Sequence, residues 1–86
     1  MTKRTVTIEL ASGLEARPIA MLVQLASSYE SKIYVESDNK KVNAKSIMGM
    51  MTLDLPVGEK EIETADGVDE GKAINDIEKY LSNNKI

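Results

Sequence analysis

The sequence predicts an α+β fold in which helices cover one face of a mostly antiparallel sheet. Two long segments each carry a single apolar stripe at helical spacing, and four short segments have the alternation or the flanking turn residues of β-strands. These elements follow one another in the order β-α-β-β-α-β-α, and a helix with one apolar stripe must bury it against a neighbouring layer. We therefore expect a two-layer sandwich. Residues 1–86 should form a single domain, because typical domains have about 100–150 residues.

The first strand and the first helix are predicted from two different periodicities. Polar and apolar residues alternate from residue 5 to residue 10, and helical spacing follows from residue 16 to about residue 29. Pro18 fits the first turn of this helix, where its missing N–H has no intrahelical partner to lose. The residues expected to face the core are Val6, Ile8 and Leu10 in the strand and Ala16, Ile19, Leu22, Val23 and Ala26 in the helix.

The next part of the chain has the pattern of a β-hairpin. A second strand over residues 32–36 places Ile33 and Val35 on one face, and a third short strand lies around Val42. Residues 37–40, Ser-Asp-Asn-Lys, are typical turn residues and connect the two strands.

Two further helices are predicted from their start and stop residues. Ser46 precedes a short apolar helix over residues 47–53, which Pro56 and Gly58 should end. Asp69 is the expected N-cap of the last helix. The apolar stripe of that helix consists of Ala73, Ile74, Ile77, Tyr80 and Leu81.

The fourth strand, predicted over residues 59–65, has an ambiguous pattern. Ile62 is its only large apolar side chain. Either Ile62 faces the core, or Ala65 does and Glu61 and Glu63 point inward with it, because a slip of one residue reverses every side chain. We expect Ile62 to face inward, with a bulge as one way for the strand to achieve this.

Composition excludes several classes of function. The chain carries a net charge of −3 and contains no His, Cys, Trp or Phe. The missing types exclude an ordinary zinc site, an imidazole acid or base, a cysteine nucleophile and a disulfide framework, and no other catalytic set is recognisable. We therefore expect no enzyme activity, no metal and no cofactor.

The same composition bears on partners and location. An acidic chain with three Tyr lacks the basic, aromatic surface of nucleic-acid-binding proteins, so no direct nucleic-acid partner is expected. No apolar run approaches the ~20 residues of a spanning helix, so membrane insertion is not expected. Residues 1–10 are basic but lack the apolar stretch of a signal peptide, which favours a cytoplasmic location.

Three polar residues near the starts of the first two helices are candidates for chemistry. Glu15 is either a capping carboxylate worth ~0.3–1 kcal/mol or a functional anion. Arg17 opposes the helix dipole, which indicates an anion clamp for phosphate or carboxylate, although a surface pair with Glu15 worth ~0–1 kcal/mol is the alternative. Ser46 is an N-cap worth about 1 kcal/mol, and its position would also accommodate a phosphate.

The short helix has too many apolar residues for one core-facing side. At 3.6 residues per turn, Met50 and Leu53 share one arc and are assigned to the core. Ile47, Met48 and Met51 share another arc and predict an exposed, Met-rich surface for protein recognition. The alternative is a loosely packed helix buried on both sides.

The two helix-opening segments together resemble a known family. Gly13-Leu14-x-Ala16-Arg17-Pro18 and Val42-Asn43-Ala44-Lys45-Ser46-Ile47-Met48-Gly49-x-Met51 are similar to motifs of the HPr family, the small phosphocarrier proteins of the bacterial sugar phosphotransferase system. Further matches are Val23-Gln24, Thr52-Leu53, Gly58 and Gly67-x-Asp69-Glu70, so that the resemblance covers nearly the whole chain. It implies an open-faced β-sandwich of four antiparallel strands under three helices.

Position 15 departs from that family. The resemblance places Glu15 where HPr proteins carry the active histidine that receives phosphate from phosphoenolpyruvate through enzyme I. A carboxylate could hold phosphate only as a far more reactive acyl phosphate, and no other His exists. We expect no catalytic residue and no ordinary histidine phosphocarrier activity.

Ser46 keeps the family's regulatory motif, which the bifunctional HPr kinase/phosphorylase phosphorylates. A retained serine and a lost histidine resemble the Crh-type homologues, which carry glutamine at position 15. The resemblance implies a regulatory protein of carbon catabolite control that binds a LacI/GalR-type catabolite control transcription factor as corepressor. The implied partner contacts are Glu15, Arg17, Ala20, Met21, Ile47, Met48 and Met51, and only the partner would touch DNA.

Other functions stay open at the level of sequence. The chain could regulate a metabolic enzyme or transporter directly. It could instead be a phosphocarrier variant in which Glu15 accepts phosphate poorly, Arg17 stabilises it, and enzyme I or other phosphotransferase-system proteins are the partners. The sequence does not decide whether Glu15 is natural or introduced, or whether it mimics phosphohistidine. It also leaves open whether the chain is a monomer or a strand-swapped dimer, and which repressor or enzyme it targets.

Overall fold

The computed structural model describes residues 1–9, 16–37, 39–53 and 58–82 of the chain. Its elements follow in the predicted order β-α-β-β-α-β-α. In the described residues, no helix is long and apolar enough to cross a membrane. The elements are β1 Thr2–Thr7, α1 Ala16–Ser27, β2 Lys32–Ser37, β3 Lys40–Asn43, α2 Ile47–Met50, β4 Lys60–Asp66 and α3 Glu70–Ser82.

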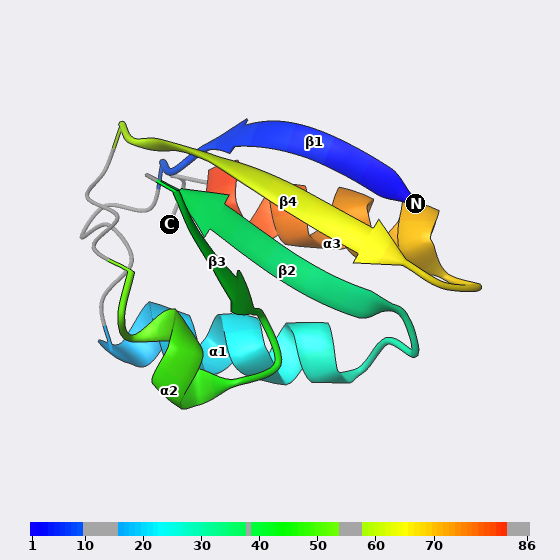
Figure 1. Cartoon of the computed structure of the whole chain (residues 1–86), viewed down its shortest axis with the longest axis horizontal. Coiled ribbons are helices and arrows are strands. Elements are labelled where there is room, and N and C mark those ends of the chain that lie inside the picture. Colours follow the sequence, from blue (N-terminus) through cyan, green and yellow to red (C-terminus); the bar gives the residue numbers. More distant parts are fainter. Residues whose placement is uncertain (10–15, 38, 54–57, 83–86) are drawn as a thin grey trace.

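The four strands form one antiparallel sheet in the order β1-β4-β2-β3, and the helices lie on one side of it (Figure 1). Helix α3 packs against β1 and β4, whereas α1 packs against α2 and α3. The predicted hairpin of β2 and β3 is confirmed, and Asn39 in its turn adopts a positive φ of 67°, which Asn tolerates better than most residues. The predicted α+β fold class is therefore confirmed.

The core lies between the sheet and the two long helices, as the apolar stripes predict. Val23 and Tyr80 are partly buried at its margin. The buried members of the two stripes are Ile19, Leu22 and Ala26 in α1 and Ala73, Ile74, Ile77 and Leu81 in α3.

Strand β1 starts and ends earlier than the alternation predicts. Its pairing with β4 runs from Thr2 opposite Ala65 to Thr7 opposite Lys60. Val6 and the following Ile8 are buried as expected, whereas Leu10 lies outside the described residues. The shift arises because the partner strand, not the local alternation, decides how much of β1 is hydrogen-bonded.

Helix α2 is shorter than predicted and ends at Met50 instead of reaching Leu53. The N–H groups of Thr52 and Leu53 donate to the carbonyls of Gly49 and Met50, both at 3.1 Å. Bonds from residue i to i−3 tighten the chain beyond the last helical turn, so the helix does not continue to Pro56, which lies outside the described residues.

The expected orientation of β4 is wrong. Ile62 is 36% exposed, whereas Glu61 and Glu63 are 1% and 0% exposed and face inward together with buried Ala65. No bulge is present, because the pairing with β1 is continuous. The reason is the register with the two neighbouring strands, because residues directly opposite each other share a face. Glu61 lies opposite the buried Val6 of β1, and Glu63 lies opposite the half-buried Arg4 of β1 and the buried Val35 of β2.

Asp69 precedes α3 as predicted, but its carboxylate does not act as the expected N-cap. It accepts hydrogen bonds from the backbone N–H groups of Glu30, at 2.9 Å, and Ser31, at 3.0 Å, and from the Ser31 hydroxyl. These bonds hold the pKa of the Asp69 carboxyl below its usual range, with the Ser31 hydroxyl as the largest cause. Asp69 therefore fixes the turn between α1 and β2, a role that depends on the tertiary structure.

Candidate functional site

Ser46 occupies the N-cap of α2, as predicted. Its backbone is extended, with φ −109° and ψ 114°, and its Oγ accepts a hydrogen bond from the N–H of Gly49 at 3.1 Å. Its own N–H donates to the carbonyl of Asn43 at 3.0 Å, which closes the turn after β3. The side chain is half-buried, so a hydroxyl at the start of a helix is held in a defined position at the surface.

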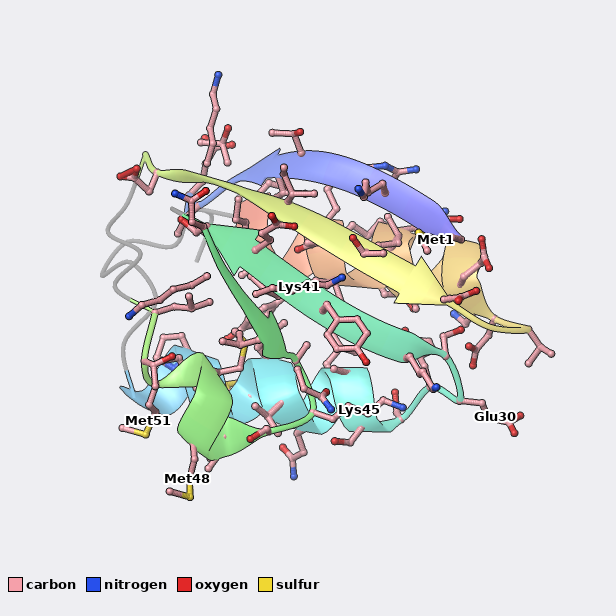
Figure 2. All side chains as sticks on the ribbon, in the orientation of Figure 1. Met1, Glu30, Lys41, Lys45, Met48 and Met51 are labelled. Atoms are coloured by element: carbon pink, nitrogen blue, oxygen red, sulfur yellow. The ribbon has the colours of Figure 1, made fainter. Side chains whose placement is uncertain are left out.

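An exposed apolar surface follows Ser46 on α2. Ile47, Met48 and Met51 are 44%, 80% and 57% exposed, and we call them the α2 patch. Met50 and Leu53 are buried, which confirms the predicted division between the two arcs. Figure 2 shows Met48 and Met51 pointing away from the body of the molecule. The alternative of a helix buried on both sides is therefore wrong.

The neighbouring helix α1 adds two more of the predicted contact residues. Ala20 and Met21 are both exposed, and α1 packs directly against α2. Glu15 lies outside the described residues. The backbone of Arg17 belongs to the first turn of α1, but its side chain lies outside the described part, so the predicted anion clamp stays a prediction.

Two lysines position α2 relative to the other elements, a role that no sequence pattern indicated. The ammonium group of Lys45, which is labelled in Figure 2, donates to the carbonyl of Tyr29 after α1 at 2.7 Å. The ammonium group of Lys40 donates to the carbonyl of Thr52 after α2 at 3.1 Å. These bonds tie both sides of α2 to the rest of the fold, so the orientation of the α2 patch is set by side-chain contacts that cross from one element to another.

Tyr80 is a third residue whose role the sequence did not reveal. It belongs to the predicted apolar stripe of α3, but its hydroxyl donates to the carbonyl of Pro18 at 3.1 Å. Burial raises the pKa of the Tyr80 hydroxyl, so it remains a neutral donor. The bond connects the C-terminal part of α3 to the first turn of α1.

Metal chemistry finds no support in the described part of the chain. Residues 1–9, 16–37, 39–53 and 58–82 contain no group of three or more Asp, Glu, His or Cys side chains arranged to hold a metal ion. What the arrangement offers chemically is a positioned serine hydroxyl beside an exposed apolar surface.

Comparison with known proteins assigns the chain to a family. Residues 2–83 match the family model described as "PTS HPr component phosphorylation site". The chain belongs to the HPr family.

Two Crh proteins and an HPr crystal structure are similar to this chain over most of its length. The HPr-like protein Crh of Bacillus subtilis (strain 168) is 42% identical over 81 residues, 94% of this chain and 95% of that protein. Crh of Halalkalibacterium halodurans is 45% identical over 74 residues, 86% and 88% of the two chains. The crystal structure of a phosphocarrier protein HPr from Bacillus anthracis str. Ames superposes with a TM-score of 0.90 at 39% identity, covering 93% of this chain and 95% of that one. The chain is thus a Crh-like member of the HPr family.

Proposed function

We propose that this HPr-family chain is a regulatory phosphoprotein of carbon catabolite control and neither an enzyme nor a histidine phosphocarrier. HPr kinase/phosphorylase phosphorylates Ser46 in the cytoplasm, where ATP is available as the phosphate donor. The modified chain then binds a LacI/GalR-type catabolite control transcription factor as corepressor, and only that factor contacts DNA. Enzyme I and other phosphotransferase-system proteins are secondary partners.

The observation that carries this proposal is the position of Ser46 directly before the α2 patch. A phosphate on its Oγ adds about −1.5 to −2 charge and three acceptor oxygens beside apolar side chains that are already exposed. Its oxygens can accept from the N–H of Gly49, which the hydroxyl engages in the unmodified chain. One surface then combines an anion with apolar anchors, which is how a partner can distinguish the phosphorylated form.

The missing phosphocarrier activity is proposed on chemical grounds. The chain contains no His, and Glu15 occupies the position of the family's active histidine. A carboxylate could hold phosphate only as an acyl phosphate and not on an imidazole nitrogen, so it does not replace the histidine as the family's reversible carrier. Glu15 and Arg17 act instead as polar contacts for the partner, next to Ala20 and Met21 on α1.

The first test is phosphorylation by HPr kinase/phosphorylase with ATP, followed by intact-mass analysis. We expect one phosphate on the wild-type chain and none on Ser46→Ala. Ser28→Ala is the matched control, because Ser28 is an exposed serine after α1, and it should accept phosphate like the wild type. A Ser46→Ala variant that still gains the phosphate would refute Ser46 as the acceptor.

A second test separates the α2 patch from the phosphate. Met48→Asp should be phosphorylated normally but bind the transcription factor at least about tenfold more weakly, because a charge replaces an apolar anchor. Val68→Asp is the control, since Val68 is equally apolar and exposed but lies between β4 and α3. Calorimetric titration of the phosphorylated chains measures the difference. Equal affinities of the two variants would exclude the α2 patch from the interface, and wild-type phosphoprotein that does not bind would mean that the target is another protein.

A further inference from the structure

Strand β4 buries two neighbouring carboxyl groups. Glu61 and Glu63 are 1% and 0% exposed, and when both are ionised none of their four carboxylate oxygens has a hydrogen-bond donor in the described part of the molecule. A hydrogen bond between the two carboxyl groups requires a proton on one of them. β4 is an interior strand of the sheet. Val6 of β1 stands directly opposite Glu61, and Glu63 lies between Arg4 of β1 and Val35 of β2. Burying an ionised carboxylate in such surroundings is strongly unfavourable, so the neutral forms fit the fold.

The charged groups on the elements packed against β4 neutralise the pair only in small part. The charge of Arg4, directly opposite Glu63 on β1, lowers the pKa of Glu63, but it is the smallest of the causes that act on it. From β1, Arg4 donates to Glu78 of α3 at 2.7 Å and to Asn75 of α3 at 2.7 Å, so its guanidinium is already engaged. Glu78 adds negative charge near Glu63, and the inward side chains of β2 carry no charge. Burial is the largest cause that raises the pKa of both carboxyl groups, and the charge of Glu61 raises the pKa of Glu63 further.

The two ends of β4 differ in how tightly they pack against neighbouring residues. At the C-terminal end, Gly67 packs closely on Ser31, so that a Cβ on Gly67 would lie 2.6 Å from the Ser31 Cα. The carboxylate of Asp69 bonds to Ser31 from the other side. This end of the strand has no room to shift.

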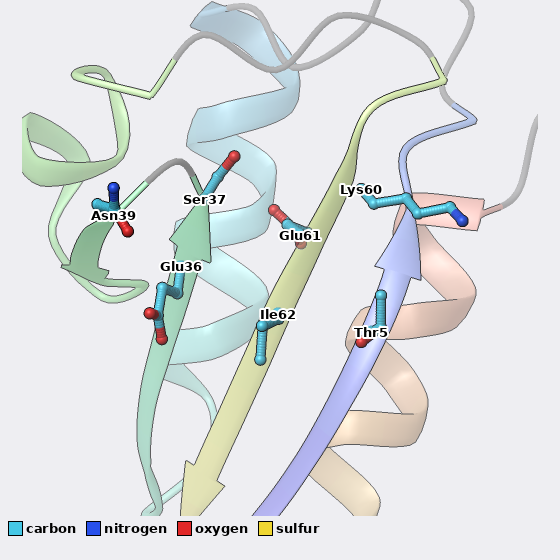
Figure 3. A pocket seen from close by; sticks show the side chains of 7 residues that line it. All are labelled: Thr5, Glu36, Ser37, Asn39, Lys60, Glu61 and Ile62. Atoms are coloured by element: carbon cyan, nitrogen blue, oxygen red, sulfur yellow. The ribbon is translucent and has the colours of Figure 1, made fainter.

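The N-terminal end of β4 borders a hollow on the sheet. Pairing between β2 and β4 stops at Glu36 opposite Ile62, so Glu61 is paired with β1 alone. Figure 3 shows Glu61 and Ser37 in the space between the two strands. This space, the β2–β4 hollow, is lined by Thr5, Glu36, Ser37, Asn39, Lys60, Glu61 and Ile62. It is the nearest route by which an ionised Glu61 can reach water.

We propose that residues 60–63 of β4 form a pH-dependent conformational switch, in which loss of protons from Glu61 and Glu63 opens this half of the strand toward the β2–β4 hollow. The protonated pair keeps the strand closed against the helices. The ionised pair gains hydration only when the strand opens, while Gly67 and Ser31 hold its other end. The switch is independent of Ser46 and of the α2 patch.

The direction of the pH response follows from proton counting. In the open form both carboxyl groups are solvated and ionise near their ordinary pKa of 4.5. In the closed form their pKa values are higher, so the closed form binds more protons above about pH 4.5. The opening equilibrium should therefore rise about tenfold per pH unit for each proton released, until the pH passes the raised pKa values.

Native-state amide hydrogen exchange between pH 5 and pH 8 tests the switch, with the intrinsic exchange rate at each pH divided out. We expect opening at residues 60–63 to increase by at least about tenfold over this range, while amides in the middle of α3 change less. In the Glu61→Gln/Glu63→Gln variant the opening should be independent of pH. Glu30→Gln, which removes an exposed carboxylate, should behave like the wild type.

A second measurement keeps the test valid even if the double variant folds poorly. The side-chain carboxyl ¹³C shifts of Glu61 and Glu63 in the wild-type chain should titrate well above the ordinary range, and opening should follow that titration. The proposal would be overturned if the carboxyl groups of Glu61 and Glu63 titrate near pH 4.5, or if the opening equilibrium measured at residues 60–63 does not change with pH.

Discussion

Replacing Glu61 and Glu63 together by valine should raise the free energy of unfolding at pH 8 by about 1–4 kcal/mol, the gain found when buried ionisable groups are replaced by apolar side chains of similar volume. Valine also favours β-strands and would pack beside the valines opposite it on β1 and β2. Urea denaturation at pH 8 and pH 5 measures the effect.

The gain should be larger at pH 8 than at pH 5. Both glutamates have a pKa above their unfolded value of 4.5, chiefly because of burial, so the folded wild type loses stability as the pH rises from 4.5 toward the raised pKa values. The valine variant has no such loss. Ile62→Thr on the exposed face of β4 is the control and should change stability by less than about 0.5 kcal/mol at either pH. An equal gain at both pH values would contradict the buried-charge explanation.

Gly67→Ala should destabilise the fold by about 1–3 kcal/mol, the usual cost of overpacking. The new Cβ would lie 2.6 Å from the Ser31 Cα and 2.7 Å from its Oγ. Ser31 cannot move away without breaking its hydrogen bonds to Asp69. Thermal or urea unfolding gives the difference from the wild type.

Gly71→Ala is the matched control for this substitution. Gly71 lies in α3, and an added Cβ would meet nothing within 4 Å. Alanine is the better helix former, so this variant should gain about 0.5–1 kcal/mol. If both glycine variants lose stability equally, the close contact between Gly67 and Ser31 is not the cause.

Much of the fold was predictable because it depends on periodicity along the chain. The stripes of α1 and α3 follow a 3.6-residue period, and their members Leu22 and Ile77 are completely buried. Ser46 was recognisable as the cap of α2 because its partner, the N–H of Gly49, lies three residues away. The α2 patch was predictable because two arcs of apolar residues on one short helix cannot both face the core.

The remaining features depend on residues far apart in the sequence. Asp69 bonds to Glu30 and Ser31, and Lys45 bonds to Tyr29, contacts that no local pattern records. In the candidate site, the family motifs predicted which positions are functional, and that stays a prediction. The orientation of α2 follows from such long-range bonds.

The orientation of strand β4 is the clearest example of a feature that the local sequence does not determine. The sequence establishes that residues 60–66 can form a strand, but a period of two residues is compatible with either face. Ile62 alone favoured one orientation, and the registers with β1 and β2 impose the other, which buries Glu61 and Glu63. Periodicity and near neighbours thus specify the elements and their order. The buried face of β4 is selected by pairing with β1 and β2, two strands that lie far from it in the sequence, because the pairing satisfies the backbone of the whole sheet and outweighs the preference of a single side chain.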